Sequence, residues 1–244
     1  MNAMLALVVC LFVLLLAVGG KQGTGSFAAL MLNSIIIMIA VILMAGGFDP
    51  LAVGIVAGML ILACTIFLSS GDSEVAGIAF VAALIVLACL VLVVLLSLHL
   101  SATAGFGAED GEDLEGMSTA IGVSFRQLAM AAGLMSTLGA IAEAAIAVAA
   151  GIHELDIDTD LPGIMQMGRE IIGTAINTLF FGFFGGFCGL FIWFAQLHYP
   201  LWQILNNKIF VSEMLDVLFS VLAVILTIPV TIWVARQRAH AARE

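Results

Sequence analysis

The sequence contains little charge. Only 10% of its 244 residues are charged and 63% are hydrophobic, and its mean hydropathy is +1.24. Soluble proteins average about 25% charged and roughly 45–50% apolar residues. The chain also lacks a polar segment long enough to form a soluble domain. A soluble globular protein is therefore excluded, and the composition predicts an integral membrane protein.

Paired cysteines and recognisable catalytic motifs are also lacking. The four cysteines stand alone in apolar runs, without the spacing of a metal site or a disulfide framework, and are interpreted as small core residues. We find no nucleophile with a base, no His/Cys ligand cluster and no phosphate-binding loop. The chain is not predicted to be an enzyme, and we expect no metal and no cofactor.

Basic residues are few, seven against 17 acidic ones. Most of the acidic excess lies in predicted loops, so nucleic acid is not an expected partner. The alternating Asp156, Asp158 and Asp160 are similar to the opening of a calcium loop, but Leu161 and Met167 stand where that loop needs Gly and Glu. Asp160 is instead expected to cap a helix whose first turn contains Pro162.

What the sequence does have is long apolar runs, which predict an all-α fold. A span needs about 20 apolar residues, and continuous apolarity indicates helices rather than alternating strands. We predict a polytopic transmembrane helical bundle of about seven spans, forming one membrane domain, with one or two interfacial helices at Met117–Gln127 and His198–Phe210. The predicted spans are 4–20, 28–47, 51–69, 76–101, 128–151, 171–196 and 213–234.

The basic residues give this bundle an orientation. Five of them, Lys21, Arg169, Arg236, Arg238 and Arg243, fall on one side of a seven-span chain. The other side has only Arg126 and Lys208. Because basic residues are enriched on the cytoplasmic side, we expect the N-terminus outside and the C-terminus in the cytoplasm.

The sixth predicted span carries polar residues into the membrane. Arg169 and Glu170 lie at its mouth, followed by Thr174, Asn177 and Thr178. Helical spacing places Arg169, Gly173 and Asn177 on one face, which is not expected to contact lipid. These polar residues are candidates for a solute or ion pathway.

Glycines follow in the same span. Gly182/Gly186 and Gly185/Gly189 are small-xxx-small pairs, which allow another helix to approach closely. Each glycine also weakens a helix by about 0.5–1 kcal/mol relative to Ala. This stretch is thus either a tight packing seam or a helix that breaks. Gly173, and Gly139 in the fifth span, are further candidates for helix packing.

An acid, Glu143, lies within the fifth predicted span. Counting residues places Glu143 and Asn177 at the same depth, about 12 Å into the membrane. A charge at mid-span costs about 2.5–3.5 kcal/mol, so Glu143 should face inward. Two hypotheses stay open: an ion or proton role, or interhelical hydrogen bonds worth about 0.6–2 kcal/mol each. Asp216 is assigned to the membrane interface.

Two segments, Gly139–Leu155 and Met167–Leu179, resemble the YibE/F family of bacterial inner-membrane proteins. Weaker likeness occurs at Gly19-Gly20-Lys21, at Phe27–Asn33, at Phe48-Asp49-Pro50 and in the acidic loop 105–116. The chain is similar to the shorter, YibF-type half, which occurs beside a longer YibE-like partner. Members of the family often have Asp where this chain has Glu143 and Glu170. The resemblance implies a permease-like complex in the bacterial cytoplasmic membrane.

Together these observations predict a permease-like subunit in the lipid bilayer. It would move an unidentified small solute or ion through polar groups of the fifth and sixth spans, and associate with a related YibE-like membrane protein, with itself, or with both. The alternative is a non-transporting structural or regulatory subunit whose glycine seam docks the partner. An intramembrane hydrolase is the third and weakest hypothesis.

Overall fold

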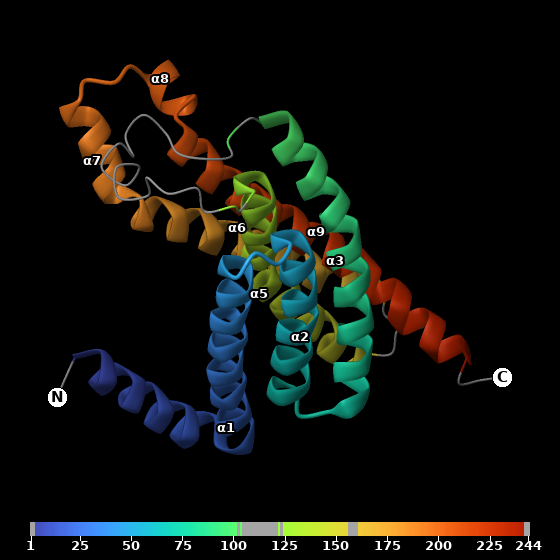
Figure 1. Cartoon of the computed structure of the whole chain (residues 1–244). Coiled ribbons are helices and arrows are strands. Elements are labelled where there is room, and N and C mark those ends of the chain that lie inside the picture. The colour runs from blue at the N-terminus through green and yellow to red at the C-terminus, as the bar shows by residue number, and fades with distance from the viewer. Residues whose placement is uncertain (1–2, 102, 104–121, 123, 156–160, 242–244) are drawn as a thin grey trace.

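The computed structural model describes residues 3–101, 103, 122, 124–155 and 161–241, and the predicted all-α fold is confirmed across these ranges (Figure 1). The acidic loop 105–116, Asp156, Asp158, Asp160 and most of the first predicted interfacial helix lie outside the described residues. The helices are α1 (Ala3–Ala45), α2 (Pro50–Ser69), α3 (Ser73–Ser101), α5 (Phe125–Glu154), α6 (Leu161–Gly186), α7 (Cys188–Gln196), α8 (Leu201–Leu205) and α9 (Lys208–Ala241).

Five described helices, α1, α2, α3, α5 and α9, are long and apolar enough to cross a membrane, and α6 with α7 forms a bent sixth candidate. The predicted count of about seven is not reproduced, because α1 includes the first two predicted spans. Gly20 interrupts its helical geometry with φ 52° and ψ −126°. The first half of α1 turns away from the bundle at this point (Figure 1).

Helix α5 forms the centre of the bundle and contacts α2, α3, α6 and α9. Its Ile141, Ala145 and Val148 are completely buried. Small residues bring the helices close together: a Cβ added to Gly54 of α2 would lie 2.8 Å from the Cβ of Ala131 on α5. Such close approach is typical of helix packing in membranes, where dispersion contacts replace the hydrophobic drive.

The first turn of α2 follows the sequence closely. Pro50 is its first residue, and the Asp49 carboxylate accepts a hydrogen bond from the backbone N–H of Ala52 at 2.8 Å. The chain thus turns at Phe48-Asp49-Pro50, between the end of α1 at Ala45 and the start of α2. Farther along, the Asn33 amide of α1 donates to the Thr65 hydroxyl of α2 at 2.8 Å, an interhelical bond in an otherwise apolar contact.

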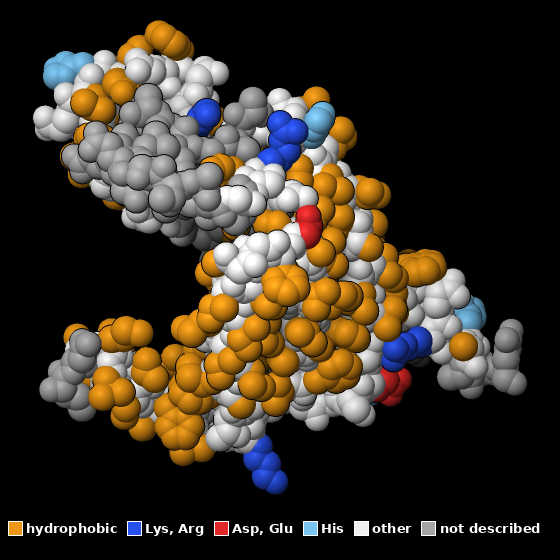
Figure 2. Space-filling view, viewed as in Figure 1, with side chains coloured by type: hydrophobic (Ala, Val, Ile, Leu, Met, Phe, Trp, Pro, Cys, Tyr) orange, Lys and Arg blue, Asp and Glu red, His pale blue; other side chains and the backbone are white. Residues whose placement is uncertain are grey.

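Polar contacts tie the helices at the two ends of the bundle. At one end, called the Lys21 end, His153 Nε2 lies 3.5 Å from Asp72 Oδ2, and Arg238 donates to a carbonyl near the start of α3. At the other, the Asp49 end, the Gln127 amide donates to the Asp49 carboxylate at 2.5 Å. Hydrophobic side chains cover the middle of the face in Figure 2, with charged groups towards its ends. This distribution fits a membrane-embedded bundle.

The α6–α7 segment begins earlier than predicted and is broken. Helix α6 starts at Leu161, ten residues before the predicted span, with Pro162 in its first turn as expected. After Gly186, Phe187 leaves helical geometry and α7 continues at 48°. The glycine-rich stretch thus includes a break. Phe183 and Phe194 pack with Phe210 of α9, which holds the bent pair to the bundle.

The second predicted interfacial helix is shorter than expected. Only Leu201–Leu205 is helical, as α8, and α9 starts at Lys208. Leu201 and Trp202 are exposed by 78% and 68%. Exposed apolar and aromatic side chains between two membrane helices are typical of a segment at the membrane surface.

Candidate functional site

A groove between α5 and α6 collects several of the predicted pathway residues. It has a volume of about 220 Å³. Glu143 of α5 and Thr174 and Thr178 of α6 supply its polar groups. The rest of the lining is apolar: Ala140, Ala144, Ala147, Ile171, Ala175, Leu179 and Val224. Three of the six predicted pathway residues are therefore brought to one place.

Sequence spacing explains the groove. The lining residues of α5 recur every three or four positions, so they occupy one helical face. Apart from Glu143 they are alanines, whose short side chains leave room between α5 and α6. On α6, Thr174 and Thr178 are four residues apart and face that room together.

The polar lining presents oxygen atoms that accept hydrogen bonds. Thr174 Oγ1 donates to backbone carbonyls of Glu170 and Ile171, both at 3.1 Å, and Thr178 Oγ1 donates to the Thr174 carbonyl at 3.0 Å. Because both hydroxyl protons are used by the backbone, the lone pairs remain for the groove. An ionised Glu143 carboxylate also only accepts. The groove thus favours a cation, or a molecule that donates hydrogen bonds.

Glu143 is exposed, and within the described ranges it makes no hydrogen bond or ion pair. It lies 11 residues before the end of α5, which is about 16 Å along the helix. At that depth a lone carboxylate is costly unless it meets water, a cation or a protein partner. The expectation that Glu143 faces inward stays a prediction, because the side chain is exposed in the described part of the bundle.

The other predicted pathway residues lie away from this groove. Arg169 and Asn177 are exposed and do not line it, and Glu170 accepts a hydrogen bond from Gln166 at 2.9 Å. The expected pairing of Glu143 with Asn177 assumed that α6 enters the membrane near Arg169. Equal depth is not sufficient for this pairing, because Thr174 and Thr178 face the groove whereas Asn177, at the same level, lies on another face of α6.

The predicted packing glycines contact nothing within the described chain. A Cβ added to any of them would meet no atom within 4 Å. We call this set the open glycines: Gly139, Gly173, Gly182, Gly185, Gly186 and Gly189. Packing of these residues against another helix of the same chain is therefore not observed, and their close-approach surface faces outward.

One acid, Asp216, lies farther inside its helix than the predicted span indicated, and its assignment to the membrane interface stays a prediction. Asp216 lies eight residues inside α9, or about 12 Å along it, and is half-buried. Its Oδ1 is 3.2 Å from the position that a Cβ on Gly133 would take. Assignment to the interface followed from a predicted span beginning at Glu213, whereas α9 starts at Lys208. The spacing of Asp216 and Ser220, one turn apart, was the available signal.

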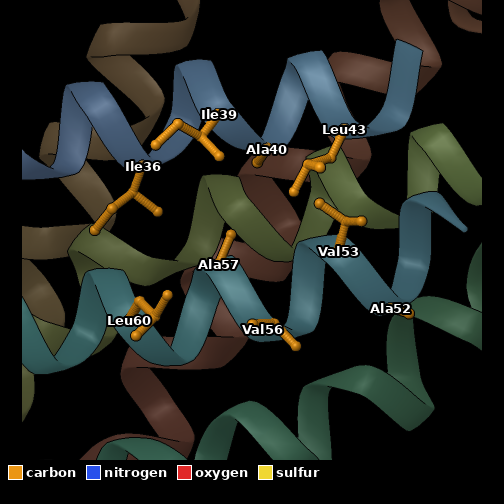
Figure 3. Close-up of a pocket in the computed structure, with 9 residues that line it drawn as sticks. All are labelled: Ile36, Ile39, Ala40, Leu43, Ala52, Val53, Val56, Ala57 and Leu60. Carbon is orange, nitrogen blue, oxygen red and sulfur yellow. The ribbon is translucent and has the colours of Figure 1, made fainter. Parts of the chain in front are cut away.

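A second groove, between α1 and α2, is apolar (Figure 3). Its volume is about 310 Å³, and its lining side chains are all hydrophobic: Ile36, Ile39, Ala40, Leu43, Ala52, Val53, Val56, Ala57 and Leu60. It offers no group that recognises a polar solute. Among the described residues, no group of three or more His, Cys, Asp or Glu side chains is arranged to hold a metal ion.

Comparison with known proteins gives one result. No curated protein and no solved structure matches the chain significantly. The family described as YibE/F-like protein matches residues 7–240, which is nearly the whole chain and includes the groove. The resemblance first seen in Gly139–Leu155 and Met167–Leu179 is confirmed, and the chain belongs to the YibE/F-like protein family.

Proposed function

We propose that this chain is a permease-like subunit that moves a small solute or ion along the groove between α5 and α6. The observation that carries the proposal is the Glu143 carboxylate, which has no partner among the described residues and lies deep along α5, beside the hydroxyl groups of Thr174 and Thr178. A carboxylate inside a membrane domain indicates an ion or proton pathway by default. Because the polar groups of the lining offer oxygen atoms as hydrogen-bond acceptors, we expect the transported species to be a cation or a molecule that donates hydrogen bonds.

The groove requires a cover in the membrane. It opens to the side of the bundle, and hydrocarbon cannot bond to its oxygen atoms. We propose that another membrane protein covers it, either a related YibE-like chain, a second copy, or both. The open glycines of α6 would contact that partner, because a surface without side chains permits close approach.

The same glycines favour a second candidate function. A structural or regulatory subunit would use them to dock its partner without moving any solute. In that case the partner fills the groove and bonds directly to Glu143. The two functions differ in whether water reaches the groove.

Access of water to the groove distinguishes the permease-like subunit from the docking subunit. In membranes that also contain the partner, and in a background without the four native cysteines, Thr174→Cys is compared with Thr137→Cys. Thr174 lines the groove, whereas Thr137 is fully buried between helices. A pathway predicts that a hydrophilic maleimide labels Thr174→Cys at least about tenfold faster. Equal, negligible labelling of the two folded proteins would favour the docking subunit.

We further propose that the chain lies in the bacterial cytoplasmic membrane with its Lys21 end in the cytoplasm. Arg238 shares that end, and Arg126 lies at the Asp49 end beside His99, at 3.5 Å, which supports the basic asymmetry.

Single cysteines at Leu155 and His198 test whether the bent α6–α7 pair crosses the membrane. As one span it places them on opposite sides of the membrane, whereas a re-entrant loop places both on the same side.

A further inference from the structure

Asp216 is an acid that the groove does not use. Its carboxylate sits where Gly133 of α5 leaves room, 3.2 Å from the position of a Cβ on that glycine. Within the described ranges the carboxylate makes no hydrogen bond or ion pair. A half-buried carboxylate without a partner is unfavourable in a membrane helix unless something compensates its charge.

Among the described residues, no basic side chain is paired with Asp216. Glu213, one turn earlier on α9, adds a second negative charge. On α5 the basic residue before Gly133 is Arg126, which lies seven residues away, about 10 Å along the helix, next to His99 of α3. The α9 residues Glu213 and Asp216 therefore place negative charge at this level, which favours a cation over an anion.

One face of α9 connects the level of Asp216 with the level of the groove. On α9, Asp216, Ser220 and Val224 follow at intervals of four residues, so they share a face. The Ser220 hydroxyl lies 2.9 Å from the Asp216 carbonyl and 3.3 Å from the Ser136 carbonyl of α5. Val224 already lines the groove of Glu143. The α9 face that carries Asp216 thus extends to the groove that contains Glu143.

On α5 the stretch between the two acids has small side chains. Gly133 and Glu143 are ten residues apart, about 15 Å along the helix. Ser136 and Gly139 lie between them and are exposed on the open side of α5. A partner covering this side would leave a narrow passage there, with an acid at each end.

We propose that Asp216 is a second cation site on the route to Glu143, nearer the Asp49 end. It attracts a small monovalent cation, either a proton or an alkali metal ion, and delivers it past Ser136 to the groove. This inference rests on the proposed function, and it adds the entrance through which the cation arrives.

The test uses Ser136→Cys, between the two acids, in the background without native cysteines. Membrane vesicles containing the chain and its partner are treated with a permanently charged trimethylammonium methanethiosulfonate and with a neutral methanethiosulfonate. The ratio of the cationic to the neutral rate should exceed that of a free thiol. Asp216→Asn should lower the ratio about fivefold, because a nearby charge partly shielded from salt is lost. Asp216→Glu should restore it.

A matched control and two competition arms complete the experiment. Glu213→Gln, which removes an exposed acid of the same helix, should lower the ratio by less than about twofold. With Asp216 unchanged, excess Na⁺ or K⁺ should slow the cationic reagent if the cation is a metal ion. Acidification should do so if it is a proton.

An unchanged ratio in Asp216→Asn, or the absence of both competition effects, would overturn the inference. The second result needs no variant at Asp216, so it decides the matter even if Asp216→Asn does not fold. A charge-dependent ratio combined with a silent Glu143→Gln would retain the Asp216 site and reject the groove as the pathway. An unchanged ratio in Asp216→Asn combined with a loss of activity in Glu143→Gln would reject only the Asp216 site.

Discussion

Glycines in two regions of the bundle have opposite surroundings. In the core, a Cβ on Gly54 would lie 2.8 Å from Ala131, and a Cβ on Gly168 of α6 would lie 2.7 Å from Ile228 of α9. Along the rest of α6, from Gly173 to Gly186, a Cβ added to the open glycines would meet no atom of the described residues within 4 Å. The first turns of α6 thus belong to the bundle, whereas its later turns offer a surface.

The difference teaches which contacts the chain completes alone. Packed glycines near α5 are satisfied by the helices of the same chain. The open side combines glycines with the polar residues Glu143, Thr174 and Asn177. Lipid tails offer no hydrogen bonds to such polar groups, and contact with lipid does not require glycine. The single chain therefore has a packed core and one face without a partner among the described residues, and that face contains the candidate site.

The strongest way to break this comparison is to enlarge a packed glycine. Gly54→Leu forces a side chain against the backbone of Ala131, whose Cα lies 3.2 Å from the added Cβ. Overpacking costs about 1–3 kcal/mol and more where backbone must move, so we expect the upper end and a clear loss of thermal stability in detergent. Gly173→Leu is the control, and it should unfold at the wild-type temperature. Equal stability of the two variants would contradict the distinction between the regions.

Gly186→Leu sharpens the comparison from the open side. A Cβ there meets no atom of the described chain, so the variant should keep its own thermal stability. Its association with the partner should nevertheless fall strongly. This association is measured as co-purification with a related membrane chain or as self-association. Unchanged association would show that this glycine is not a contact.

Asn177→Ala should have the smallest effect on the chain itself. Asn177 is exposed and does not line the groove, so its loss should change stability by less than about 0.5 kcal/mol. A weakened association with the partner is still expected, because an amide on a membrane surface needs a protein hydrogen-bond partner. Thermal unfolding and co-purification of the same sample measure both. A large loss of stability would place Asn177 in an internal contact.

Much of the fold follows from the sequence because apolar length is a strong signal. The helix boundaries at Pro50 and Ser101 lie within a residue or so of the predicted ones. The count of spans does not follow, since Gly20 bends α1 without ending it and Phe187 interrupts α6–α7. Hydropathy reports how long a run is, but not whether it turns within the membrane.

The candidate site was predicted in part for a similar reason. Glu143, Thr174 and Thr178 stand out as polar residues in apolar runs, and the structure brings them together. Asn177 lies at the level of the groove but on another face of α6, and residue counting gives the depth of a side chain but not the rotation of its helix against a neighbour. The start of α9 at Lys208, five residues before the predicted span, was missed because it lies in a polar stretch that hydropathy alone does not assign to a helix.

The most direct test of the central claim is Glu143→Gln, which retains the shape and hydrogen bonding of the side chain but removes its charge. Cell fitness or solute flux is measured beside the detergent stability of the same protein, with Glu143→Ala and the distant Glu213→Gln for comparison. If Glu143 binds a cation or proton during transport, Glu143→Gln should lose activity while its stability stays within about 0.5 kcal/mol of wild type. Glu143→Ala should lose activity and association with the partner, and Glu213→Gln should remain active. A stable and fully active Glu143→Gln protein would contradict the pathway and leave this chain a docking subunit.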